Sequence, residues 1–71
     1  MAFTEAQLVA QLDPTDTGRT ITLQTFNPSV LYTDIYAIGV TAPYAGRSRY
    51  MQILQSNTPA QAAAAIQAGL S

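Results

Sequence analysis

The chain of 71 residues contains no cysteine, no histidine and no lysine. Without cysteine it forms no disulfide, and without cysteine and histidine it lacks the usual ligands of structural zinc. The same absences remove most pairs of a nucleophile and a general base. Because the four acidic residues are also scattered along the chain, the sequence predicts a protein that is not an enzyme and that binds no metal ion and no cofactor.

Charged side chains are scarce as well. They make up 10% of the residues, whereas an ordinary soluble domain has about a quarter. Charge depletion is typical of the core of protein interfaces, and a net charge near zero favours association. We therefore favour a subunit whose surface is covered in an assembly over a monomer that glutamine and threonine keep soluble.

Neither a signal peptide nor a membrane span is indicated by the sequence. The first residues lack a basic region, and no apolar run approaches the about 20 residues that a membrane helix needs. We expect one small domain over residues 1–71 without a membrane partner. At this size a single core supplies only about 3–5 kcal/mol of stability.

The longest β-prone run, residues 30–41, is apolar on both of its alternating faces. This pattern predicts the central strand of a sheet that is covered on both sides, with Ile35 and Ile38 buried on opposite faces. The small residues Ala37 and Gly39 would let a neighbouring backbone or helix approach closely.

A helix is predicted near each end of the chain. Thr4 and Gln7 form a capping box for the first helix, which ends at about Leu12. The second helix starts after Thr58, with Pro59 at its first position and Gln61 completing another capping box. Gly69 is predicted to end it in the left-handed conformation. The predicted packing face of the second helix consists of Ala62, Ala63, Ile66 and Leu70.

Two further strands are predicted at residues 19–26 and 47–55, with turns at residues 13–18 and 27–29 and a hairpin loop of about four residues within 41–46. The fold class is therefore α+β. We expect a small three-stranded antiparallel meander, flanked by an N-terminal and a C-terminal helix in the order α-β-β-β-α.

The turn at residues 13–18 contains Asp13, Asp16 and Gly18, which resemble part of a calcium loop. An EF-hand loop also needs further oxygen ligands and a distal bidentate glutamate, which this chain lacks. We therefore interpret these residues as a turn held by hydrogen bonds from side chains to the backbone.

Arginine and tyrosine, which are enriched at protein interfaces, gather around the third strand. The interface candidates are Tyr44, Arg47, Arg49, Tyr50 and Tyr36. Tyr44 is the strongest, because the requirements of a turn do not select a tyrosine. The alternative is a binding module for an anionic ligand or nucleic acid, with bases stacked on tyrosine. Three arginines neutralise few phosphates, so the sequence argues against nucleic acid; pairing of the arginines with acids such as Asp34 is the simpler interpretation.

In composition the chain resembles small structural proteins of bacterial viruses, which are short, rich in alanine, threonine and glutamine, poor in lysine and free of cysteine. The resemblance implies a non-enzymatic assembly subunit of the virion, such as a capsid decoration (cement) protein or a connector. Its partners would be other protein chains, through self-association or within a larger assembly. If the resemblance misleads, we expect a cytoplasmic protein.

Overall fold

The computed structural model describes residues 3–12 and 21–71. The elements follow the order α1 (Glu5–Leu12), β1 (Ile21–Pro28), β2 (Tyr32–Gly39), β3 (Ser48–Leu54) and α2 (Pro59–Leu70). The predicted α+β class and the order α-β-β-β-α are confirmed. The predicted turn at residues 13–18, with its calcium-loop alternative, and the predicted start of the first strand at residues 19–20 lie outside the described residues.

The three strands form one antiparallel sheet in the order β1-β2-β3, so β2 is the central strand, as predicted. Ile35 of β2 lies opposite Phe26 of β1 and Met51 of β3. The pairing of β1 with β2 shifts between Leu23 and Thr25, where β1 contains a bulge. Both outer strands, β1 and β3, are edges of an open sheet.

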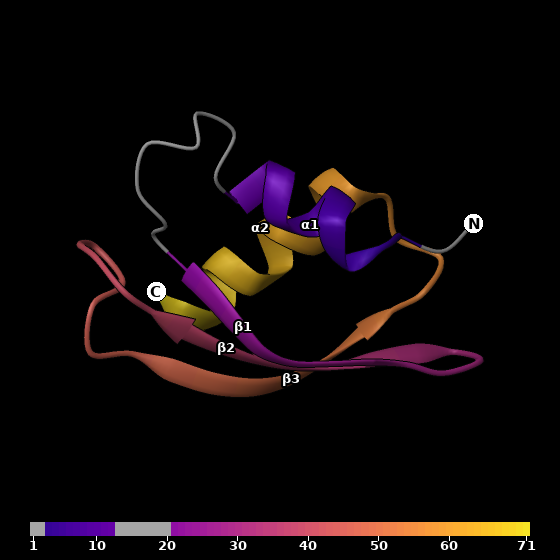
Figure 1. The fold of residues 1–71 in the computed structure, drawn as a ribbon, viewed down its shortest axis with the longest axis horizontal. Coiled ribbons are helices and arrows are strands. Elements are labelled where there is room, and N and C mark those ends of the chain that lie inside the picture. Colours follow the sequence, from indigo (N-terminus) through magenta and orange to yellow (C-terminus); the bar gives the residue numbers. More distant parts are fainter. Residues whose placement is uncertain (1–2, 13–20) are drawn as a thin grey trace.

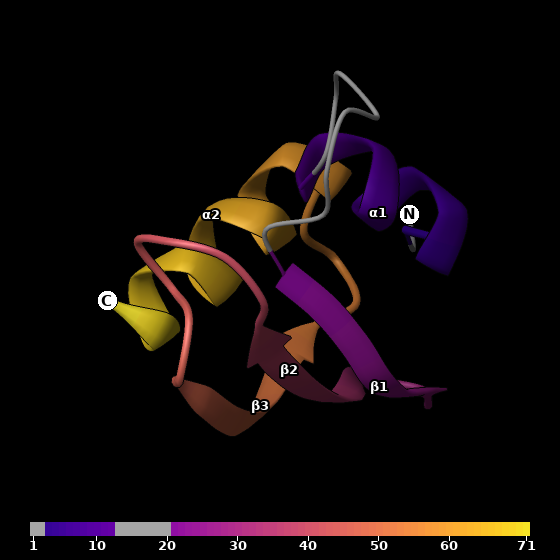
Figure 2. The same cartoon turned by 60° about the vertical axis from the view of Figure 1, so that its left-hand side comes forward.

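Both helices lie on the same side of the sheet, where α1 packs against α2 and α2 against β2 and β3 (Figures 1 and 2). The core fills the space between the helix layer and the sheet. Its buried apolar side chains are Phe3, Leu8, Leu12, Ile21, Ile35, Ala37, Ile53, Ala62, Ala63, Ile66 and Leu70.

Because the helices share one side, the other side of the sheet is not covered by residues 3–12 or 21–71. Along β2, the residues that face the helices are buried from Thr33 to Gly39, whereas the alternate residues are not. The prediction that both Ile35 and Ile38 are buried is therefore confirmed for Ile35 and wrong, within the described chain, for Ile38, which is half-buried. We call the uncovered side the open face; in β2 and β3 it consists of Tyr32, Asp34, Tyr36, Ile38, Ser48, Tyr50, Gln52 and Leu54.

Both predicted capping boxes are present. In α1, the Thr4 N–H donates to Gln7 Oε1 at 3.0 Å and the Gln7 N–H donates to Thr4 Oγ1 at 3.1 Å. In α2, the Thr58 N–H donates to Gln61 Oε1 at 2.9 Å and the Gln61 N–H donates to Thr58 Oγ1 at 3.2 Å. Each pair of bonds satisfies two backbone groups that a helix start would otherwise leave without an intrahelical partner.

The prediction for Gly69 is wrong, because α2 continues through Leu70 and only Gly46 has a positive φ among the described glycines. Gly69 instead makes room for a neighbouring side chain. A Cβ at this position would lie 2.9 Å from Met51 Sδ, which is closer than the two atoms can approach. The glycine therefore serves the packing of α2 on β3.

We expect Thr58→Ala to lower the free energy of unfolding by about 1 kcal/mol, since the Gln61 N–H loses its acceptor. Urea denaturation followed by circular dichroism at 222 nm measures the change. Thr58→Ser is the matched control, because serine keeps the hydroxyl, and it should stay close to the unmodified protein. Equal midpoints for the alanine and serine variants would show that the cap bond contributes nothing.

Candidate interaction surfaces

The hairpin between β1 and β2 turns later than the sequence predicts. β1 continues through Asn27 and Pro28, which pair with Asp34 and Thr33, so the predicted turn at residues 27–29 is wrong. The Ser29 N–H donates to the Tyr32 carbonyl at 2.8 Å. In an antiparallel ladder this bonded pair leaves the adjacent Pro28 nitrogen pointing away from β2. A proline is tolerated there because it lies on an edge strand and no ladder bond is lost.

The two residues at the tip of this hairpin are Val30 and Leu31, which are 92% and 66% exposed. Two-residue hairpin loops favour asparagine, aspartate and glycine, which adopt the required backbone angles. The turn itself therefore does not explain two large aliphatic side chains. Tyr32 and Leu54, which lie opposite each other at the adjoining end of the sheet, are also exposed. We call these four residues the tip patch.

Gln55 holds the hairpin tip against the end of β3. Its backbone N–H donates to the Leu31 carbonyl at 2.9 Å, and its Nε2 donates to the Ser29 carbonyl at 3.1 Å. Its Oε1 accepts a hydrogen bond from the hydroxyl of Thr33, which is fully buried. The tip patch is thus fixed in position by three hydrogen bonds, so ordering it on binding costs little conformational entropy.

Two of the predicted interface tyrosines come together on the open face. The rings of Tyr36 and Tyr50 stack with their centroids 5.1 Å apart and their planes at 30°. Tyr50 is the more exposed of the two, at 64%. Beside them, Gln52 Nε2 donates to Asp34 Oδ1 at 3.0 Å, so the acid of this face bonds to an amide.

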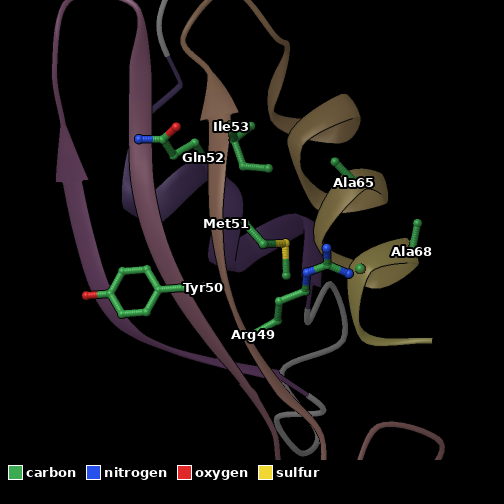
Figure 3. Close-up of a pocket in the computed structure, with 8 residues that line it drawn as sticks. Arg49, Tyr50, Met51, Gln52, Ile53, Ala65 and Ala68 are labelled. Atoms are coloured by element: carbon green, nitrogen blue, oxygen red, sulfur yellow. The ribbon is translucent and has the colours of Figure 1, made fainter.

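The predicted arginines are not on the same surface as these tyrosines. Arg49 extends on the helix side of the sheet towards the C-terminal end of α2, whereas Tyr50 points the other way (Figure 3). Its Cδ lies 3.8 Å from the position that a Cβ on Gly69 would occupy. A cation is favourable at this end of a helix dipole. Arg47 is exposed in the link before β3, and neither arginine forms an ion pair with the acids in the described part of the chain, Asp34 included.

Tyr44 is half-buried and packs against the core. The link between β2 and β3 spans residues 40–47, longer than the predicted loop, and makes two successive turns. The Tyr44 N–H donates to the Thr41 carbonyl at 2.9 Å, and the Arg47 N–H donates to the Tyr44 carbonyl at 3.0 Å. Packing within the chain is thus a sufficient reason for a tyrosine here, and its role in an interface stays a prediction.

The site predicted from the sequence lies at the β2–β3 link, whereas the tip patch lies at the opposite end of the sheet. The signal was present in the printed sequence, since the aliphatic pair Val30 and Leu31 directly follows Asn27, Pro28 and Ser29. If those three residues form the turn, the aliphatic pair falls in the predicted central strand, residues 30–41. Only the pairing of Pro28 with Thr33 shows that the turn comes later.

Over residues 3–12 and 21–71, no group of three acidic side chains could hold a metal ion. Neither of the two described helices is long and apolar enough to cross a membrane. Comparison of the chain with protein-family models, with curated proteins and with solved structures found no match. The chemistry of the tip patch and the open face is therefore the basis for a functional interpretation.

Proposed function

We propose that this chain is a non-enzymatic structural subunit that acts through protein–protein contacts. More specifically, we propose a small virion component such as a capsid decoration or connector protein. The observation that carries the proposal is the tip patch, where Val30 and Leu31 are exposed at a turn that does not require them. Burying one such side chain contributes about 1.5–3 kcal/mol to the free energy of association. The chain gains this free energy only when another protein covers the side chain.

The open face extends the tip patch into a surface that a second copy of the chain can cover. Three strands of seven to eight residues, at about 3.3 Å per residue and about 4.8 Å between strands, make a flat area of roughly 400 Å². A standard interface buries about 800 Å² on each partner. The sheet alone is therefore small for a stable dimer, and the interface must include Val30 and Leu31.

Self-association also fits the charge of this surface. Asp34 is the side chain charged at neutral pH that the described strands place among the aromatic and aliphatic side chains of this face, and its carboxylate already accepts a hydrogen bond from Gln52. This surface offers a strongly charged partner few charges of opposite sign. Homodimer interfaces are more apolar than other interfaces, which favours a second copy.

The test is the double variant Val30→Ser with Leu31→Ser, whose mass in solution is measured by sedimentation equilibrium. We expect the unmodified protein to sediment as a multiple of 7.6 kDa. Loss of two buried aliphatic side chains should weaken its association by about a hundredfold or more. Val40→Ser is the matched control, because Val40 is an exposed valine outside the tip patch. A monomeric unmodified protein, or unchanged association of the double variant with intact circular dichroism, contradicts the proposal.

The virion part of the proposal is supported by the resemblance in composition and has its own test. Trypsin cleaves after Arg19 and after Arg47 and releases residues 20–47 as a marker peptide. We expect mass spectrometry to find this peptide in virus particles purified on a density gradient from the source culture. Its presence in the cell lysate but not in the particles would leave an assembly subunit with a location outside the virion.

A further inference from the structure

The outer edge of β3 carries backbone groups that neither of the other two described strands uses. At one end of the β2–β3 ladder, the Gly39 N–H donates to the Arg47 carbonyl; at the other end, the Gln55 N–H donates to the Leu31 carbonyl. In an antiparallel ladder, bonded residues alternate with residues whose N–H and C=O point outward. The outward-pointing residues between these two ends are Ser48, Tyr50, Gln52 and Leu54.

The two edges of the sheet differ in how well they are protected from pairing with another strand. β1 contains a bulge at Leu23 and Thr25 and a proline at Pro28, and both features discourage pairing with another strand. β3 pairs with β2 without a shift in register and contains no proline. Its edge is therefore a regular template for one more strand.

A groove lies between this edge and α2. Its volume is about 520 Å³, within the range of binding sites for small ligands and side chains. It is open because the α2 residues that line it, Ala65, Ala68 and Gly69, are small; Figure 3 shows Ala65 pointing towards β3. A second hollow, of about 530 Å³, lies beside Tyr50 and Gln52. Space is thus present along the β3 edge for the alternating side chains of an added strand.

We infer that the β3 edge binds an extended segment of another protein as a fourth strand, with an apolar side chain in the groove and an acidic side chain next to Arg49. Strand addition to an exposed edge uses main-chain hydrogen bonds for affinity and flanking pockets for selectivity. Arg49 is the charged group that selects the acid, since no carboxylate is among the described residues that line the groove. The β3 strand of a second copy contains arginine and no acid, so it does not fit this requirement.

This inference rests on the proposed function in that it names a partner of an assembly subunit. It depends on the outward backbone groups of β3 and on the groove next to α2, whereas self-association depends on Val30 and Leu31 of the tip patch; the two share only open-face side chains of β3. The two ideas therefore fail separately, and the double variant Val30→Ser with Leu31→Ser should retain binding at the edge.

The probe is an acetylated six-residue peptide of alternating valine and threonine with one glutamate, added to ¹⁵N-labelled protein. We expect its binding to shift the amide signals of Ser48, Tyr50 and Gln52, together with those of Ala65 and Ala68. The matched peptide with lysine in place of glutamate should bind at least about tenfold more weakly, because one opposite charge becomes a like charge. Shifts confined to the tip patch, or none at millimolar peptide, overturn the inference.

Variants at Gln52 isolate the main-chain contribution. Both Gln52→Pro and Gln52→Ala lose the side-chain hydrogen bond from Gln52 to Asp34. Only Gln52→Pro also removes the outward backbone N–H, and neither variant loses a backbone hydrogen bond to β2. We expect the proline variant to bind the glutamate peptide about tenfold more weakly than the alanine variant, since a main-chain bond is lost and the ring obstructs the added strand. Equal affinities, with both variants folded by circular dichroism, overturn strand addition.

Arg49→Glu tests the charge selection. We expect this variant to prefer the lysine peptide over the glutamate peptide, which reverses the order seen with the unmodified protein. An unchanged order shows that Arg49 does not select the partner. The inference is also overturned if Arg49→Glu binds neither peptide and self-associates more strongly than the unmodified protein. That result would show that the β3 edge pairs with a second copy of the chain.

Discussion

A protein carrying Gly39→Ala is expected to be largely unfolded in buffer without denaturant. A Cβ at position 39 would lie 1.7 Å from the Tyr44 carbonyl oxygen and 2.4 Å from its carbonyl carbon. These are backbone atoms, so the whole link between β2 and β3 would have to move. Overpacking of this kind costs about 1–3 kcal/mol or more, which is comparable to the about 3–5 kcal/mol that a core of this size supplies.

Circular dichroism and the dispersion of amide signals in a ¹H–¹⁵N spectrum measure the effect. Gly46→Ala is the control within the same link. No atom lies within 4 Å of a Cβ at Gly46, but its φ is +81°, so alanine there costs about 1–2 kcal/mol through the backbone alone. If the melting temperature of Gly39→Ala is no lower than that of Gly46→Ala, the backbone of Tyr44 does not pack closely against Gly39 of β2.

The second large effect is expected for Ile66→Ala, with a loss of about 2–5 kcal/mol in the free energy of unfolding. Ile66 is fully buried in the middle of α2. Because Ala62 and Ala63 make up half of the buried face of this helix, only Ile66 and Leu70 contribute large apolar side chains. A helix rich in alanine is marginal by itself, so removal of Ile66 should detach α2 from the sheet.

Urea denaturation provides the measurement, and the helical signal should fall at lower urea than in the unmodified protein. Ala64→Ser is the control on the exposed side of the same helix. It should cost only about 0.5 kcal/mol through helix propensity. Equal unfolding curves for Ile66→Ala and Ala64→Ser would mean that α2 does not pack on this core.

The features that sequence predicted correctly depend on residues close together in the chain. Thr58 and Gln61 define the start of α2, because the capping box is a relation across three residues. The start of α1 is defined in the same way by Thr4 and Gln7. The close approach of another backbone segment to Gly39 was also predicted, although the sequence does not show that this segment is the one around Tyr44.

The features that sequence did not predict depend on segments that meet only in the fold. Nothing in the local pattern of Ile38 shows that α1 packs against α2 and leaves the far side of β2 uncovered. Similarly, Asn27 and Pro28 carry strong turn signals, yet pairing with β2 keeps both in β1. Tyr44 appeared suited to a partner because its contact with the core is invisible in the sequence.

The one-sided cover of the sheet also affects how this chain can evolve. Successive residues of β2 are under different structural constraints. Ile35 and Ala37 are buried in the core, whereas Tyr36 and Ile38 lie on the open face. A substitution on the open face changes the exposed surface and leaves the core side chains of the same strand in place. Every second residue of β2 can therefore vary with little effect on the stability of the fold.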